Sequence, residues 1–269
     1  IGQFHFSRSL ISVFMIFGVA RIFGMPVVPR FWKPILVRTC FMVTSALLYF
    51  GALPMIPIAE AGAGLFTSPI FVLLFSILLF REKVGWSRVA AVLIGSCGVV
   101  LVLQPQSNGF SIYQVMPIMA GALYAITSII TYRYLQEESP LAILMSFILV
   151  LGASGAFITT GLSAFPANQE VIERAPFLFK GWQSVDGLYW LKLLVIAAGA
   201  TAALSLLTRG YQLTRTSYAA VFEYAYLISV GFFSWLFWGV VPNLLSIIGI
   251  LLIIIAGVII SLAQQTDKN

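Results

Sequence analysis

The stretch that decides the fold is Ser139–Gln169, SPLAILMSFILVLGASGAFITTGLSAFPANQ, which contains no Asp, Glu, Lys, Arg or His. A helix needs about 20 predominantly apolar residues to cross the hydrocarbon core of a bilayer, and this stretch is longer than that. A transmembrane β-barrel would need short segments in which polar and apolar residues alternate, whereas this stretch is apolar on every side. It is therefore expected to form a membrane-spanning helix.

The rest of the chain has the same character. Four further stretches also lack charged residues and histidine, namely Thr39–Ala59, Ala61–Phe80, Val89–Tyr132 and Tyr224–Thr266. The chain has 269 residues and is only 9% charged, far below the roughly 25% of an average soluble domain. The sequence thus predicts an all-α polytopic membrane protein.

Turn residues divide the chain into nine expected spans, because Pro, Gly, Asn and Ser gather at the breaks. The spans are expected at 7–25, 34–53, 58–80, 87–103, 112–133, 140–163, 188–209, 217–238 and 244–263. Only one connection, 164–187, is long, and it is expected to be a loop.

The positions of Lys and Arg predict how these spans are oriented. Alternate loops hold most of them, namely Arg30, Lys33, Arg81, Lys83, Arg88, Arg133, Arg209 and Arg215, with Lys268 in the tail. The opposite loops hold only Arg174 and Lys180. Because cytoplasmic loops are enriched in Lys and Arg, the loops at 81–88 and 209–215 and the C-terminus are expected in the cytoplasm, and the protein in a bacterial inner membrane. The net charge of +6 reflects this topology rather than a surface for nucleic acid, since no basic patch is interleaved with aromatic residues.

The chain also repeats itself. Sliding Pro57–Leu103 forward by 159 positions places Gly98-Val99-Val100 on Gly257-Val258-Ile259, and it places Ala61 on Ala220. An odd number of span-to-span steps separates the matching spans, so the two copies are expected to run in opposite directions through the membrane. Such an inverted repeat is typical of many secondary transporters.

Several short motifs recur in a characteristic order. In the first half they are Tyr49-Phe50-Gly51-Ala52-Leu53, Ile56-Pro57-Ile58-Ala59-Glu60-Ala61, Ser68-Pro69, Arg81-Glu82, Gly95 and Gly98-Val99-Val100-Leu101. In the second half they are Tyr132-Arg133, Ser139-Pro140, Thr208-Arg209-Gly210-Tyr211 and Ala219-Ala220-Val221-Phe222-Glu223-Tyr224. Through the order and spacing of these motifs, nearly the whole chain resembles the EamA-type permeases of the drug/metabolite transporter superfamily.

The resemblance implies ten helices in two inverted sets of five, with residues 1–104 as the first repeat and 111–265 as the second. Since the first half has four expected spans, the family's first helix is expected to be missing from this chain and to be encoded before Ile1. The chain departs from the family after the ninth helix's Glu-Tyr, where Tyr226 and Ile228 replace a frequent second acid and proline. The Gly-Glu that commonly follows that helix is also absent.

The function that the resemblance implies is secondary active or facilitative transport of small organic metabolites by alternating access. Amino acids or related compounds are the expected substrates, and protons are the candidate coupling ion. Two other functions stay open: a membrane scaffold or receptor that moves nothing, and a truncated permease without activity. The expected partners are a small-molecule substrate and the lipid bilayer, with no cofactor and no metal.

Two acids are candidates for substrate binding or coupling, because a charge near the bilayer centre costs at least about 2.5–3.5 kcal/mol. Glu60 lies in the first turn of its span, where it either caps the helix or reaches the interface, or else contacts substrate. Glu223 lies about two turns into its span and is expected to face the central cavity, where it contacts a cationic group or carries a proton. The alternative is a protonated acid that only joins two helices. Tyr224 and Tyr226 flank it, either as ligand contacts or as interface anchors.

Arg8 and Arg38 lie near span ends, where a long stem can place the guanidinium among the headgroups. A carboxylate-binding role, or a structural role between helices, stays open for both. Tyr49 and Tyr124 either line the cavity or pack between helices.

Enzymatic activity is not expected. The sequence has no zinc-protease His-Glu motif, no nucleotide-binding Gly-rich loop that ends in Gly-Lys, and no intramembrane Asp pair. His5 is the sole histidine. Cys40 and Cys97 both lie inside apolar segments, so no paired-cysteine metal site is available.

Overall fold

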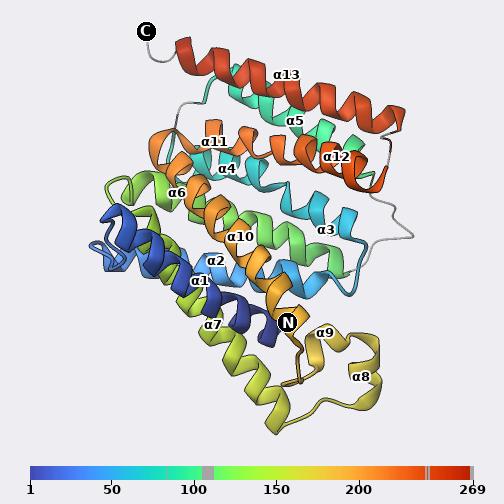
Figure 1. Ribbon diagram of the computed structural model, residues 1–269. Coiled ribbons are helices and arrows are strands. Elements are labelled where there is room, and N and C mark those ends of the chain that lie inside the picture. Colours follow the sequence, from blue (N-terminus) through green and yellow to red (C-terminus); the bar gives the residue numbers. More distant parts are fainter. Residues whose placement is uncertain (83, 105–111, 240, 242, 267–269) are drawn as a thin grey trace.

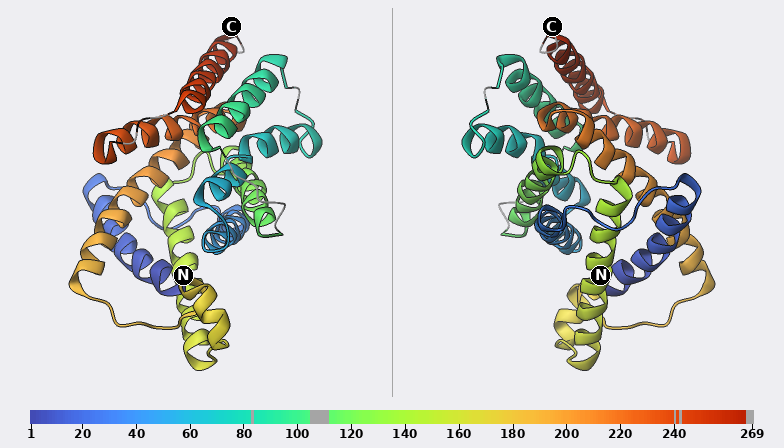
Figure 2. Two further views of the ribbon diagram at one scale, coloured as in Figure 1. Left: turned by 90° about the vertical axis from the view of Figure 1, so that its right-hand side faces the viewer. Right: turned by 90° about the vertical axis from the view of Figure 1, so that its left-hand side faces the viewer.

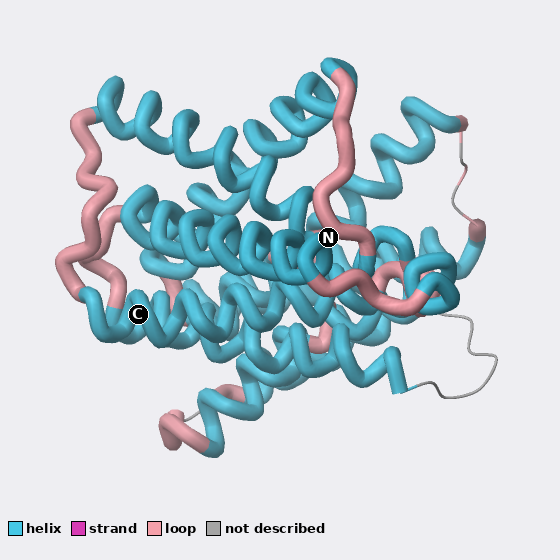
Figure 3. The backbone as a smooth tube through the Cα atoms, turned by 90° about the horizontal axis from the view of Figure 1, so that it is seen from below, coloured by secondary structure: helices cyan, strands magenta, loops and turns pink. Residues whose placement is uncertain are grey.

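The structure is a computed structural model that describes residues 1–82, 84–104, 112–239, 241 and 243–266 (Figure 1). The described residues form helices and no strands (Figure 3). The helices in chain order are α1 (Gly2–Phe23), α2 (Trp32–Ala52), α3 (Ile58–Leu65), α4 (Ser68–Leu78), α5 (Trp86–Leu103), η1 (Ile112–Gln114), α6 (Val115–Tyr134), α7 (Pro140–Ala164), α8 (Gln169–Arg174), α9 (Pro176–Phe179), α10 (Gly187–Leu213), α11 (Thr216–Phe222), α12 (Ala225–Trp238) and α13 (Leu244–Thr266).

In the described part of the chain, eight helical segments are long and apolar enough to cross a bilayer. The ninth expected span corresponds to α13, whose apolar part, Leu244–Ile260, is shorter than these eight segments. The prediction of an all-α polytopic membrane protein is confirmed.

The distribution of side chains is inverted relative to a water-soluble protein. The bundle exterior carries large apolar side chains, such as Phe14, Phe157 and Phe237. The interior holds polar ones, among them Ser12 and Thr201, whose hydroxyl oxygens lie 3.1 Å apart in a hydrogen bond. An exposed apolar surface of this extent fits lipid rather than water, and hydroxyl groups between helices supply the polar contacts that hold such bundles together.

Two of the expected spans, 58–80 and 217–238, are present as membrane-spanning segments, but a short turn interrupts each of them near the middle. The first breaks at Phe66 and Thr67, directly before α4, which has a proline in its first turn. Pro69 has no N–H to donate to the Leu65 carbonyl four residues earlier, and its ring would clash with that carbonyl in a continuous helix, which explains this break. The second breaks at Glu223 and Tyr224, between α11 and α12, and no glycine or proline marks it. These two spans are the pair that the 159-residue slide superimposes.

The connection 164–187, expected to be a loop, contains two short helices, α8 and α9, which lie at lower right in Figure 1. Gln3 ties this segment to the start of α1, because its Nε2 donates to the Gln183 carbonyl (2.8 Å) and its Oε1 accepts from the Gln183 N–H (3.0 Å). The connection is therefore docked on the bundle.

Successive spans cross the bundle in opposite directions, which gives it two ends. The basic end comprises the connections 24–31, 79–82, 84–85, 135–139 and 214–215 and lies at left in Figure 1. The long-loop end comprises the connections 53–57 and 165–186. Lys83 and Lys268, on which part of the topology prediction rests, and Ser111, the expected start of the second repeat, lie outside the described residues.

Helices α5 and α13 lie side by side, as Figures 1 and 2 show from three sides. Glycines permit this contact: a Cβ atom placed on Gly98 would lie 2.7 Å from the carbonyl oxygen of Gly249 and 2.9 Å from Cγ1 of Ile253. Both distances are too short for any side chain. Gly95, one turn earlier, faces the ring of Tyr224 in the same way, at 2.5 Å from a Cβ position. Small residues thus set the helix spacing.

Candidate functional site

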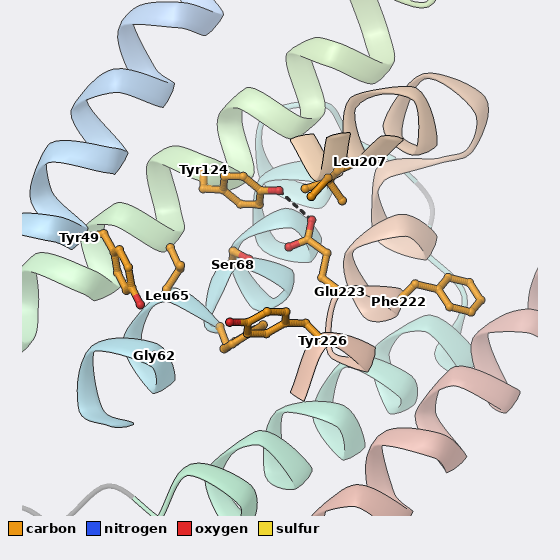
Figure 4. A pocket seen from close by; sticks show the side chains of 11 residues that line it. Tyr49, Gly62, Leu65, Ser68, Tyr124, Leu207, Phe222, Glu223 and Tyr226 are labelled. Carbon is orange, nitrogen blue, oxygen red and sulfur yellow. Dashed lines mark hydrogen bonds between the residues drawn. The ribbon is translucent and has the colours of Figure 1, made fainter. Parts of the chain in front are cut away.

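A cavity of about 500 Å³ lies where the two interrupted spans break (Figure 4). Ligand sites for small molecules commonly enclose about 300–1,000 Å³, so this cavity suits a metabolite. It is lined by Tyr49, Gly62, Leu65, Phe66, Ser68, Tyr124, Ala203, Leu207, Phe222, Glu223 and Tyr226. These residues come from α2, α3, α4, α6, α10, α11 and α12 and from the two breaks, so the cavity joins both halves of the chain.

Among the described residues, Glu223 is the only acid that lines this cavity. Its Oε1 accepts a hydrogen bond from the Tyr124 hydroxyl (2.9 Å, dashed in Figure 4) and another from the Tyr211 hydroxyl. Within the described chain, Oε2 accepts no hydrogen bond and is available to a ligand. Two phenols from α6 and α10 thus orient a carboxylate whose second oxygen is open to the cavity.

Aromatic rings form much of the cavity wall. Tyr49 comes from the last turn of α2, Phe66 from the first break, and Tyr226 from the first turn of α12. The rings of Phe66 and Tyr226 stack with centroids 6.1 Å apart and an interplanar angle of 29°. An aromatic wall beside one carboxylate is suited to a cation, because ring faces and the carboxylate both attract positive charge.

A second, much smaller polar pocket adjoins the cavity through Tyr124 and Leu207, which line both. It encloses about 20 Å³, and besides these two residues it is lined by Arg38, Met42, Thr127, Ser128, Thr131, Leu204, Thr208 and Tyr211. Arg38 is buried there: its Nε donates to Oγ1 of Thr131 (2.9 Å), and its Nη1 has no hydrogen-bond partner in the described part of the chain. We call this space the Arg38 pocket.

Four of the eight residues singled out from the sequence thus meet around the main cavity, namely Tyr49, Tyr124, Glu223 and Tyr226. The other four lie elsewhere. Tyr224, next to Glu223, is fully buried against α5, and its hydroxyl lies 2.9 Å from the Ser96 hydroxyl in a hydrogen bond. Arg38 lines the adjoining pocket.

Glu60 and Arg8 are also separate from the cavity. Glu60 is buried near the start of α3, where its Oε2 accepts from Nε2 of Gln114 (2.7 Å). Arg8 is buried on α1, with its guanidinium carbon 5.7 Å from the ring centroid of Phe4. Neither side chain reaches the headgroup region by extending away from the bundle, since both are enclosed by it.

Tyr211 was not among the residues singled out, although it holds Glu223. It belongs to the motif Thr208-Arg209-Gly210-Tyr211, and its only sequence signal is its place in that motif. Gly62, which was not singled out either, lines the cavity as well. The contact between Tyr211 and Glu223 depends on how α10 turns back onto α11, which no local pattern encodes.

The EamA-like transporter family model matches residues 2–104. The match confirms the resemblance to EamA-type permeases for the part of the chain that contributes Tyr49, Gly62 and Ser68 to the cavity.

Curated proteins that are similar in sequence to this chain are transporters. A riboflavin transporter of Brucella anthropi is 25% identical over 77% of this chain and 68% of its own length. The pseudopaline exporter CntI of Pseudomonas aeruginosa is 26% identical over 97% of this chain and 86% of its own length. A solved structure with 18% identity covers 100% of this chain and 90% of its own, with a TM-score of 0.78, so the two share a fold.

Proposed function

We propose that this protein is a permease that carries small organic metabolites across the membrane by alternating access. The observation that carries the proposal is the cavity at the two breaks, which holds one carboxylate, Glu223, inside a bundle of membrane-spanning helices. Interrupted helices that meet near the bilayer midplane form the substrate site in several transporter folds. The family match at residues 2–104 and the transporter relatives support the same function.

We propose that residues 1–104 and 111–265 form two inverted repeats around this site. The interruption of both matching spans supports this division, as does the pairing of α5 with α13, the last described spans of the two halves. Two related halves can rock against each other between two states of similar energy, which alternating access requires. A scaffold or receptor has no need for such symmetry.

Within small metabolites, the cavity favours compounds that carry an amine, such as amino acids. Oε2 of Glu223 and the Tyr226 ring suit an ammonium group. Ser68 begins α4 at the same cavity, and half-helix N-termini attract anionic groups such as a carboxylate. A zwitterion would therefore meet complementary charge at both ends.

The experiment that tests the proposed function is counterflow in proteoliposomes. Vesicles that contain the purified protein are loaded with one compound class at a time, and uptake of the labelled compound is measured. Amino acids and other small amines are expected to exchange faster than in protein-free vesicles. Equal rates in both kinds of vesicle for every class would contradict a permease and favour a scaffold or receptor.

We also propose that the basic end faces the cytoplasm of a bacterial inner membrane, with the C-terminus on the same side. Single cysteines at Glu137, on the 135–139 connection, and at Lys180, on the 164–187 connection, are expected to react with a membrane-impermeant thiol reagent from opposite sides. Both positions are exposed, and Cys40 and Cys97 are replaced by Ser beforehand. Labelling of both positions from one side would contradict the topology.

A further inference from the structure

A buried acid at the basic end has no part in the cavity. Glu138 lies between α6 and α7 and is 2% exposed. Its Oε2 accepts from the backbone N–H groups of Arg30 (2.7 Å) and Phe31 (3.0 Å), which directly precede α2, and its Oε1 accepts from the N–H of Ser139 (3.0 Å), which directly precedes α7. N–H groups at helix starts lack partners within their own helices and carry partial positive charge. The one carboxylate of Glu138 therefore accepts hydrogen bonds at the N-terminal ends of two helices, α2 and α7.

Gln212 of α10 completes this cluster from the other side. Its Nε2 donates to the carbonyl oxygens of Leu135 (2.5 Å), at the end of α6, and of Glu138 (2.7 Å). Gln212 is buried as well. We call the carboxylate of Glu138, the amide of Gln212 and the backbone groups they bind the Glu138–Gln212 clasp. It fastens α2, α6, α7 and α10 together at the basic end.

Helix α10 links the clasp to the cavity, as does α6, which contributes Tyr124 to Glu223 and the Leu135 carbonyl to the clasp. Tyr211, the residue before Gln212 on α10, donates its hydroxyl hydrogen bond to Glu223. Leu207, one turn earlier, lines both the cavity and the Arg38 pocket. If α10 moves as a rigid helix when the contact of Tyr211 with Glu223 changes, the contacts of Gln212 in the clasp change as well.

The Arg38 pocket lies next to the clasp along α10. Thr208 and Tyr211 line the pocket, and Gln212 of the clasp is the next residue in the chain after Tyr211. Its walls hold the hydroxyls of Tyr124, Thr127, Ser128, Thr131, Thr208 and Tyr211. Its volume of about 20 Å³ holds one water molecule at most, so no metabolite passes in this state. A polar interior that is too narrow for substrate is expected on the closed half of a transport route.

We propose that the Glu138–Gln212 clasp is the gate that closes the basic end, and that α10 couples it to the occupancy of Glu223 through Tyr211. When a substrate amine or a proton takes the place of the Tyr211 hydroxyl at Glu223, the end of α10 is released and the clasp opens toward the Arg38 pocket. The proposal rests on the proposed function, because a gate matters only if substrate passes.

The test measures access rather than transport. Ser128, buried in the wall of the Arg38 pocket, is replaced by Cys in a background that carries Cys40→Ser and Cys97→Ser. A membrane-impermeant thiol reagent is added at the basic end of oriented vesicles, and the labelling rate is followed. Gln212→Ala and Tyr211→Phe are each expected to raise this rate about ten-fold, because each removes hydrogen bonds that hold the closed state.

The matched control is Gln114→Ala, which removes a part-buried Gln–Glu contact, that of Gln114 with Glu60, near the start of α3 and away from the clasp. It is expected to leave the rate at which the introduced thiol is labelled from the basic end unchanged. Glu138→Gln serves as a second, isosteric variant if Gln212→Ala does not fold, and it too is expected to raise the rate. Unchanged labelling in the clasp variants, or an equal rise with Gln114→Ala, would overturn the proposal.

The same experiment separates failure of the gate from failure of the proposed function. If counterflow is observed in the parent protein and the clasp variants label at the parent rate, the gate is wrong and the permease stands. If the clasp variants label faster but no compound exchanges, the clasp is a movable closure and the permease is wrong.

Discussion

Replacement of Glu223 by Gln is expected to lower the apparent affinity for an amine substrate by about ten-fold to a hundred-fold. Gln keeps an oxygen that can accept from Tyr124 and Tyr211 but loses the negative charge that faces the cavity. Hydrogen bonds that involve a charged group contribute about 1.5–3 kcal/mol, which corresponds to this range. The measurement is counterflow as a function of substrate concentration at acidic, neutral and mildly alkaline pH.

The difference in affinity between wild type and Glu223→Gln is expected to depend on pH. A protonated carboxyl group resembles the amide of Gln, whereas the ionised carboxylate does not. Wild type and Glu223→Gln are therefore expected to converge at acidic pH and to differ most at alkaline pH. Glu60→Gln is the matched control, since it alters a buried acid that does not line the cavity. If Glu223→Gln keeps the wild-type rate, affinity and pH response, Glu223 only joins helices, as the structural alternative holds.

The second large effect concerns stability. Gly98→Ala is expected to destabilise the folded protein by about 1–3 kcal/mol, because the new methyl group would lie 2.7 Å from the Gly249 carbonyl oxygen. The backbones of α5 and α13 must separate to admit it, which weakens packing along the whole contact between these helices. The melting temperature of the purified protein in detergent measures the effect.

The control for this substitution is Gly257→Ala on α13. A Cβ atom on Gly257 would meet nothing within 4 Å, so the same chemical change is expected to leave the melting temperature near that of the wild type or slightly above it. An equal melting temperature for both variants would show that the close approach at Gly98 does not limit stability.

The positions of the spans could be predicted from the sequence because the requirement is local: a run of apolar residues of sufficient length must cross the bilayer. The break before α4 could also have been predicted from the sequence, since Ser68-Pro69 follows a glycine-rich segment. The break at Glu223 was not, because Val221-Phe222-Glu223-Tyr224-Ala225 contains no residue that disfavours a helix strongly. Tertiary contacts of Glu223 and Tyr224 override local preference there.

The cavity, too, could be predicted only in part from the sequence. Glu223 drew attention because a carboxylate deep in a span is costly, and that argument needs only one residue and its depth. Its hydrogen-bond partners come from α6 and α10, so their identity depends on how distant spans pack. For the same reason Tyr224, adjacent in sequence, was grouped with the site although it faces Ser96 on α5. Adjacent residues on a helix point in different directions, and only the packing decides which faces the cavity.

The central claim, that substrates cross through the cavity beside Glu223, is tested most directly by blocking the cavity. Gly62 lines it, whereas Gly18 has no atom within 4 Å of a Cβ position and lies on the bundle surface. Counterflow of an amino acid is compared for wild type, Gly62→Phe and Gly18→Phe, reconstituted at equal amounts. The account predicts exchange by wild type and Gly18→Phe and almost none by Gly62→Phe. Equal exchange by all three proteins would contradict it.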